Sequence, residues 1–426
     1  MRMNKKKEIV PKLRFPEFIG DKLKITKLGK ISSVVKEKAG ENKYTLMSVT
    51  SGVGLIPQTE KFGREIAGDS YKNYIVIRKY DFAYNKSATK QFPEGYISML
   101  GEYDIAAVPN SIFTCFRITG NESYPPFFDY LWHNNYHGHW LRKYIEVGAR
   151  AHGALSVDTK HLWSMPLALP DFKEQQKIAD CLSSIDELID AESRKLKALE
   201  KYKKGLMQKL FPAEGKTMPE WRFPEFQDCE EWETVKLEKL ALYRRGSFPQ
   251  PYGLPEWYDE KSGMPFIQVF DVDDNMKLKS NTKNKISELA AQQSVFIPKG
   301  TLIITIQGSI GRVAITQYDA YIDRTLLLFE KFFRKIDKTF LAYNLQLLFD
   351  IEKQKAPGGI IKTITKQALS EFLTSIPQIE EQEKIAGCLS EVDTMITEQS
   401  NKVEQLKAHK KGLMQGLITT LEEADI

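Results

Sequence analysis

Three closely spaced histidines are the residues with the clearest potential for metal chemistry. His133, His137 and His139 have a spacing that could hold a metal ion. No fourth ligand stands out, and residues 132–140 are rich in aromatic side chains, so a packing or surface role is the better interpretation. The cysteines are scattered and form no CxxC pair, which indicates reduced thiols rather than zinc ligands. They are Cys115, Cys181, Cys229 and Cys388.

Cofactor motifs are incomplete wherever the chain approaches one. Gly215-Lys216-Thr217 ends like a P-loop, but Leu210 stands where its first glycine belongs. The pair Gly52 and Gly54 is followed by Pro57 and gives no dinucleotide fingerprint. Tyr124-Pro125-Pro126-Phe127 is similar to the Pro-Pro-aromatic corner of amino-methyltransferases, but it begins with Tyr and has no glycine-rich loop before it, which favours a structural turn. We therefore expect a recognition part without catalysis, metal or cofactor of its own.

Polar residues suited to base edges or phosphates occur in loops between predicted strands. Arg pairs well with guanine and Asn or Gln with adenine, while Gly lets backbone N–H groups approach phosphate. The DNA-binding candidates of the first half are Lys43, Ser51, Lys86, Ser87, Lys90, Gln91, Asn110, Arg150 and His152. Those of the second half are Arg244, Arg245, Ser247, Gln268, Gln307, Ser309, Arg312, Arg324 and Lys362. Each of them can alternatively be a solvated loop residue.

The elements that must position these loops come from a tandem duplication. Residues Pro170 to Leu210 recur as Pro377 to Leu417, with about half of the residues identical over roughly 40 positions. Within the repeat, Glu174-Gln175-x-Lys177-Ile178-Ala179 matches Glu381-Gln382-x-Lys384-Ile385-Ala386. A shorter echo opens each half, since Arg14-Phe15-Pro16-Glu17-Phe18 returns as Arg222-Phe223-Pro224-Glu225-Phe226.

The repeated segment predicts a coiled-coil helix. Its apolar positions step by four and three residues, and the polar occupants of the seam fall at the same two places, Glu192 and Lys203 in the first copy and Gln399 and Lys410 in the second. The predicted seam residues are Ile178, Leu182, Ile185, Ile189, Leu196 and Leu199, with Ile385, Leu389, Val392, Ile396, Val403 and Leu406 in the second copy. Two unrelated amphipathic helices, each packed on its own domain, are the alternative.

Duplicated halves that pack through like helices favour a two-fold axis, which makes the helices antiparallel. From Ile178 to Leu210 the helix would extend roughly 50 Å. One turn of B-DNA is about 34 to 36 Å, so a rigid spacer of that size suits a bipartite DNA site. Inserting or deleting one turn in both helices, between Ile189 and Leu196 and at the matching site, is expected to change the spacer of the target but neither half-sequence.

Each half has a middle segment between its Arg-Phe-Pro-Glu-Phe opening and its repeated helix. The two middles predict an α+β fold made of short strands and one helical region each. The expected strands are 44–49, 74–77, 81–84, 111–118, 265–270, 295–297, 301–306, 312–315 and 325–329, and the expected helices are 126–144 and 339–354. We expect recognition domains at 1–165 and 213–373 and conserved helices at 166–212 and 374–426.

Composition is ordinary for a globular protein, with 42% hydrophobic and 27% charged residues. No apolar run reaches the roughly 18 residues of a membrane-spanning helix, so we expect a cytoplasmic protein without membrane contact. The net charge of +5 permits a nucleic acid partner.

Together, the Arg-Phe-Pro-Glu-Phe openings, the divergent middles and the helices beginning Pro-x-x-x-Glu-Gln-x-Lys-Ile-Ala resemble the specificity subunit of Type I restriction-modification systems. The resemblance implies two target recognition domains that each read one half of a split, asymmetric sequence in double-stranded DNA. It also implies antiparallel helices that set the spacer and dock two methyltransferase (modification) subunits. Those partners would carry S-adenosylmethionine for N6-adenine methylation, and restriction/translocase subunits would use ATP and magnesium for translocation and cleavage.

Two other functions are compatible with these residues. A free-standing bipartite DNA-binding or architectural protein would bind its target tightly when purified alone. A methyltransferase with an unrecognised cofactor site would label DNA from S-adenosylmethionine without any partner.

Overall fold

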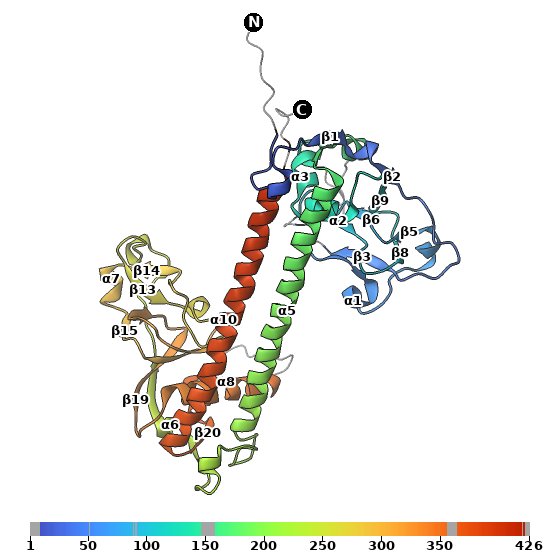
Figure 1. The fold of residues 1–426 in the computed structure, drawn as a ribbon. Helices are drawn as coiled ribbons and strands as arrows, with labels where there is room; N and C mark the ends of the chain where they lie inside the picture. Colours follow the sequence, from blue (N-terminus) through green and yellow to red (C-terminus); the bar gives the residue numbers. More distant parts are fainter. Residues whose placement is uncertain are drawn as a thin grey trace. The chain divides into compact units, whose positions relative to one another are not determined.

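The computed structural model describes residues 9–50, 52–87, 89, 92–145, 158–355, 364–419 and 421. The chain forms two compact units (Figure 1). Unit 1 contains Met1–Glu192 and Lys402–Ile426, and unit 2 contains Ser193–Asn401. Two 39-residue helices, α5 (Phe172–Leu210) and α10 (Ile379–Leu417), contribute to both units.

Unit 1 is mixed α and β. Its strands are β1 (Lys24–Lys27), β2 (Ser32–Val34), β3 (Met47–Thr50), β4 (Gly54–Pro57), β5 (Ile75–Arg78), β6 (Asp81–Asn85), β7 (Tyr96–Met99), β8 (Ile105–Val108), β9 (Phe113–Ile118) and β10 (Pro166–Leu169). Its shorter helices are α1 (Gln58–Phe62), α2 (Pro125–His133), α3 (Tyr136–Leu141) and α4 (Thr159–Trp163).

Unit 2 is built from the same kinds of element. Its strands are β11 (Glu233–Lys236), β12 (Ala241–Arg245), β13 (Met264–Ile267), β14 (Asn284–Ile286), β15 (Val295–Ile297), β16 (Leu302–Thr305), β17 (Val313–Ile315), β18 (Ala320–Ile322), β19 (Leu326–Phe332) and β20 (Leu373–Ile376). Its shorter helices are α6 (Leu237–Leu240), α7 (Glu288–Ala291), α8 (Lys338–Lys355) and α9 (Lys366–Ser370).

The two units have the same strand topology although their middles do not repeat in sequence. The four-stranded sheet β2-β9-β6-β7 of unit 1 corresponds to β12-β19-β16-β17 of unit 2. The pairs β1–β10, β3–β4 and β5–β8 correspond to β11–β20, β13–β14 and β15–β18. The parallel pairing of β13 with β18 also has its counterpart, since Leu46 and Ala107 form a parallel bridge beside β3 and β8. The duplication therefore includes the divergent middle segments, strand for strand.

This architecture confirms the predicted α+β class with paired helices. Buried apolar runs produce the predicted strands, as in β16, where all four residues are buried. The prediction of one helix over 126–144 was wrong, because Asn135 adopts a left-handed conformation (φ 56°) and separates α2 from α3. In unit 2, α8 is continuous and directs Leu341, Leu345 and Phe349 toward the sheet core.

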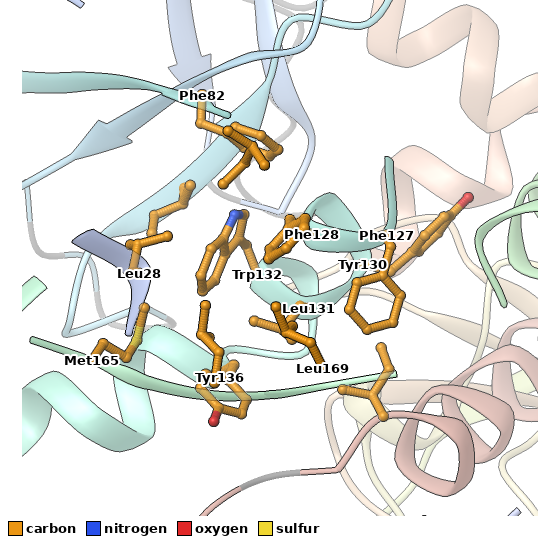
Figure 2. Packing of buried hydrophobic residues seen from close by; sticks show 14 of the residues in the cluster. Leu28, Phe82, Phe127, Phe128, Tyr130, Leu131, Trp132, Tyr136, Met165 and Leu169 are labelled. Carbon is orange, nitrogen blue, oxygen red and sulfur yellow. The ribbon is translucent and has the colours of Figure 1, made fainter. Parts of the chain in front are cut away.

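The core of unit 1 joins its strands and short helices to the long helices. Figure 2 shows Trp132 with Leu28 and Phe128 on either side, all fully buried. The same cluster includes Leu182 of α5 and Leu417 of α10. Burying one large apolar side chain contributes about 1.5–3 kcal/mol, so this shared core attaches the domain firmly to both helices.

Unit 2 has an equivalent core, which includes residues of both α5 and α10. Leu210 of α5 and Leu389 of α10 are buried together with Trp232 and Phe340 from the rest of unit 2. The phenyl ring of Phe340 stacks on that of Phe211, with 5.2 Å between ring centroids. Each unit thus needs segments of both long helices to complete its core.

Within each unit the helices pair antiparallel, as predicted. In unit 1, Glu192 and Asp186 of α5 form ion pairs with Lys402 and Lys410 of α10. Residue numbers therefore rise along one helix as they fall along the other. In unit 2, Lys203 Nζ lies 2.6 Å from Asp393 Oδ1.

Candidate nucleic-acid interface and its frame

The repeated arginine and glutamate form a buried bidentate ion pair in each unit. Arg14 donates to Glu174 from Nε (2.8 Å) and Nη2 (2.6 Å). Arg222 donates to Glu381 in the same way, at 2.9 and 2.6 Å. The hydrogen bonds to the glutamates raise the pKa of both arginines. These pairs attach the opening segment of each half to the start of a long helix.

The repeated glutamine ties each long helix to the recognition domain. Gln175 Oε1 accepts a hydrogen bond from the Tyr124 amide (2.9 Å), just before α2. Gln382 Oε1 accepts one from the Asp337 amide (3.1 Å), just before α8. Because both side chains are buried, the motif is explained by this structural role.

A tyrosine, an aspartate and a lysine connect three elements in each unit; we refer to these groups as the Tyr–Asp–Lys contacts. In unit 1, Tyr130 of α2 donates to Asp186 Oδ2 (3.0 Å), and Lys410 Nζ lies 2.7 Å from the same oxygen. The Lys410 ammonium also lies 5.2 Å from the centroid of the Tyr130 ring. Burial, together with the Asp186 charge, raises the pKa of Tyr130, so its hydroxyl remains a donor.

Unit 2 repeats this arrangement with different sequence around the tyrosine. Tyr343 of α8 donates to Asp393 Oδ2 (2.6 Å), and Lys203 lies over its ring at 5.2 Å. Burial, followed by the Asp393 hydrogen bond, raises the pKa of Tyr343. The two aspartates occupy matching positions of the repeat, which could have indicated a shared role. The tyrosines belong to no repeated motif, so the sequence did not indicate them.

The predicted seam residues lie on the inner side of the helix pair. All of them are buried or half-buried, and Ile178, Leu182, Ile385, Leu389, Val392 and Val403 are the buried ones. The polar residues of the seam form ion pairs. Lys203 and Lys410 belong to the Tyr–Asp–Lys contacts, and Glu192 pairs with Lys402. Gln399 is buried.

Most described candidates of unit 2 gather at one edge of its sheets, which we call the loop edge of unit 2. The Ser247 amide donates to Ile322 O and the Asp323 amide to Ile267 O, so the connections after β12, β13 and β18 adjoin. The Ile306 amide donates to Thr325 O, which adds the connection after β16. Arg245, Ser247, Gln268, Gln307, Ser309, Arg312 and Arg324 therefore belong to one surface region.

Several of these side chains already have partners within the protein. Arg312 pairs with Asp274 (2.7 Å), Arg244 pairs with Glu330 (3.0 Å), and Gln268 accepts from Asn284 (2.6 Å). The Arg324 guanidinium lies 4.8 Å from the Tyr252 ring centroid and is exposed. For the side chains of Arg245, Gln307 and Ser309, the described part of the chain provides no hydrogen-bond partner, which leaves them free for an external ligand.

The loop edge of unit 1 is formed by the corresponding connections. The Lys86 amide donates to Ile112 O, which places Lys86 and Ser87 beside the connection that holds Asn110. Lys43 is not brought to this edge. It lies before the first residue of β3, whereas the loop edge lies where β3 ends. Ser51, Lys90, Gln91, Arg150, His152 and Lys362 lie outside the described residues.

The histidine cluster is dispersed by the fold. His137 is fully buried, with Nε2 3.2 Å from Gly95 O, whereas His139 is exposed. His133 Nδ1 lies 3.7 Å from Asp129. Among the described residues, no group of three or more His, Cys, Asp or Glu side chains is arranged to hold a metal ion. No helix in the same residues is long and apolar enough to cross a membrane.

Because His137 is buried, we expect the free energy of unfolding to fall in weak acid. Burial lowers its pKa from 6.5 to about 4, so the folded protein holds the ring neutral. Its contribution is complete above pH 6.5 and is lost as the pH falls toward about 4, by about 3 kcal/mol in total. Urea unfolding at about pH 7 and about pH 4.5 should show this loss in the wild type. The loss should be smaller in His137→Phe, and equal losses in both would contradict it.

The fold defines a class of protein with two units of the same strand topology. Each unit has a loop edge and includes segments of two long helices that arose by duplication. A sequence model described as "Type I restriction modification DNA specificity domain" matches residues 73–201 and 229–408. The chain belongs to this family.

Two relatives come from Methanocaldococcus jannaschii. The putative type I restriction enzyme MjaX specificity subunit is 29% identical over 282 residues, which cover 64% of this chain and 63% of the relative. The MjaVIII specificity subunit is 26% identical over 295 residues, covering 65% of this chain and 66% of the relative. The matches thus span slightly less than two thirds of the relatives' lengths.

Two solved structures share the fold. The type I restriction-modification S subunit from M. genitalium has a TM-score of 0.59 at 13% identity, covering 97% of this chain and 100% of that one. A chain described under "Structural basis underlying complex assembly and conformational transition of the type I R-M system" has a TM-score of 0.57 at 17% identity. The coverage is 94% of this chain and 98% of that chain.

Proposed function

We propose that this chain is the DNA-recognition subunit of a Type I restriction-modification complex and performs no catalysis itself. The observation that carries this proposal is the combination of one repeated frame with two loop edges of unrelated sequence. A protein that reads two different half-sequences needs two surfaces of equal placement and different chemistry. Unit 1 would read one half of the split target and unit 2 the other.

The long helices would set the spacer between the half-sequences. They support this role because each is continuous for 39 residues and because ion pairs fix their register in both units. We assign residues 1–165 and 213–373 to the recognition domains and 166–212 and 374–426 to the conserved helices.

The same helices would dock two methyltransferase subunits. S-adenosylmethionine would be bound by those partners, and ATP and magnesium by restriction/translocase subunits, so this chain would need no cofactor. The complex would act in the cytoplasm on double-stranded DNA.

Mapping methylated adenines across the genome, with and without the gene for this chain, tests the proposal. A split, asymmetric motif that disappears with the gene supports it. An unchanged methylation map would refute it. Methylation of DNA by the isolated chain would instead favour an enzyme, and tight specific binding without partners would favour a free-standing DNA-binding protein.

Exchanging residues 20–165 for the same domain of a relative should change one half-sequence and leave the other unchanged. The reason is that the described candidates at the loop edge of unit 1, Lys86, Ser87 and Asn110, all lie within this segment. The methylation map of cells carrying the hybrid measures the result, and the reciprocal exchange of residues 221–373 is the control. A change in both half-sequences after one exchange would show that the units do not read independently.

A further inference from the structure

The candidate arginines of unit 2 differ in what they already bind. Two of them form ion pairs within the protein, with Asp274 and with Glu330. An internal ion pair occupies the charge and the N–H donors that a base would need. The other two, Arg245 and Arg324, are exposed and have no carboxylate partner in the described part of the chain. These two arginines are therefore available to an external ligand.

Arg324 is further distinguished by an aromatic ring that restrains it. Among the described residues, only Arg324 of these two lies over a ring, with its Cζ atom 4.8 Å from the centroid of Tyr252. The Tyr252 ring stacks in turn on the buried Phe248, with 5.0 Å between the centroids. A guanidinium that stacks on a ring keeps the N–H donors of its own plane free. Arg324 is thus restrained in position and remains able to donate.

The buried carboxylate of Asp323 fixes both the tyrosine and the backbone beside Arg324. Asp323 Oδ2 accepts a hydrogen bond from the Tyr252 hydroxyl. Asp323 Oδ1 accepts from the Thr325 amide (2.8 Å) and from the Thr325 hydroxyl (2.6 Å). Burial, followed by the hydrogen bond to Asp323, raises the pKa of Tyr252, so the hydroxyl remains a donor. One carboxylate therefore holds the ring under Arg324 and the residue that follows Arg324.

The β18–β19 connection, which carries Arg324, is also bound to its neighbours through the backbone. The Asp323 amide donates to O of Ile267, the last residue of β13 (3.0 Å). A Cβ atom at Gly246, which follows β12, would lie 2.5 Å from Asp323 O. Glycine at this position lets the two backbones approach closely. The ends of β12 and β13 thus fix the place of Arg324 at the loop edge of unit 2.

We propose that Arg324 reads a guanine in the half-sequence of unit 2, and that Tyr252 and Asp323 are its positioning residues. This inference rests on the proposed function. Arginine suits guanine because two of its N–H groups can donate to O6 and N7 in the major groove. A side chain that is already restrained loses less conformational entropy on binding, which favours a specific contact. The corresponding β8–β9 connection of unit 1 carries the exposed Asn110, a residue type suited to adenine.

The test selects bound duplexes from a random-sequence pool, using the full chain assembled with its modification subunits. The wild type should yield two half-sequences, and the exchange of residues 20–165 assigns each of them to a unit. Arg324→Ala should reduce the preference for one guanine in the half-sequence of unit 2 by about tenfold and leave the other half-sequence unchanged. Arg324→Lys should lose the same preference, because an ammonium group keeps the charge but lacks the planar pair of donors.

Variants of Tyr252 test the positioning role. Tyr252→Leu removes the ring and should weaken the preference for the same guanine, whereas Tyr252→Phe keeps the ring and should retain most of it. In an Arg324→Ala background, Tyr252→Leu should cause no further loss, because no guanidinium is left to restrain. The same additional loss in both backgrounds would show a merely structural role for Tyr252 and would overturn its assignment.

Arg334→Ala is the matched control for the loss of an arginine. Arg334 follows β19, at the end of the strand opposite to Arg324, and pairs there with Glu233 (2.5 Å). Its replacement should change neither half-sequence. A loss of guanine preference equal to that of Arg324→Ala would show that the effect comes from the net charge of the unit, and the inference would be wrong.

The outcomes separate this inference from the function on which it rests. If Arg324 bound a phosphate group, Arg324→Ala would weaken binding to all duplexes alike and reduce the salt dependence of the affinity. That result would overturn the inference, as would an unchanged preference at every position of the half-sequence. If the wild type selects no split sequence, the proposed function itself fails. A split sequence without guanine in the half read by unit 2 would refute the inference alone.

Discussion

Replacing Arg222 by alanine should lower the free energy of unfolding of unit 2 by about 3–5 kcal/mol. The substitution leaves the Glu381 carboxylate, which is 1% exposed, without its bidentate partner. A buried charge without a partner costs far more than a broken surface pair. Urea unfolding monitored by tryptophan fluorescence, to which the buried Trp232 of the same unit contributes, measures the change.

The pair Lys236–Glu371 provides a matched control in the same unit. Its side chains are 44% and 58% exposed, so Lys236→Ala should cost far less stability than Arg222→Ala. The double variant Arg222→Leu with Glu381→Leu should recover much of the stability, because no charge then remains buried. A loss of less than about 1 kcal/mol for Arg222→Ala would contradict this account of the repeated motif.

Lengthening both long helices by seven residues should lengthen the spacer of the DNA target by about three base pairs. We place the insertions between Glu192 and Ser193 and between Asn401 and Lys402, where the chain passes from one unit to the other. Seven residues are preferable to a single turn because the seam repeats every 3.5 residues and keeps its face. Each helix gains about 10 Å, while the Tyr–Asp–Lys contacts of both units remain intact.

The measurement is again the map of methylated adenines, and the half-sequences should not change. An insertion in α5 alone is the control, because it brings unequal helix lengths together and should abolish methylation. A spacer that stays the same after the paired insertion would show that the helices do not set it.

The frame of this protein was accessible from sequence because it rests on local periodicity and on duplication. The 3.5-residue seam predicted the helices, and apolar runs predicted strands such as β15 and β16. The break between α2 and α3 was missed, since the left-handed conformation of Asn135 depends on tertiary packing rather than on helical periodicity.

The common strand topology of the two domains was harder to predict from the sequence. Their strands pair over long sequence separations, and β19, for example, lies between β12 and β16 in its sheet. Such pairing leaves no repeat in the sequence when the core residues differ. The contact of His137 with Gly95 O and the packing of Phe349 against Gly311 were missed for the same reason, because both rings come from helices far along the chain.

Residue types alone placed most candidates of unit 2 in loops that the structure brings together. They did not show which side chains the protein uses internally, as it uses Arg312 for Asp274. That distinction depends on the partners each side chain meets after folding. Whether the remaining candidates contact DNA stays a prediction.

The Tyr–Asp–Lys contacts have a consequence for how such chains can diversify. Each recognition domain supplies only a tyrosine to its contact, while the aspartate and lysine come from the duplicated helices. A domain with a suitably placed tyrosine is thus compatible with either attachment point. Two domains that exchanged places would reverse the order of the two half-sequences in the target. A new target would then arise by rearrangement, without any new contact to DNA.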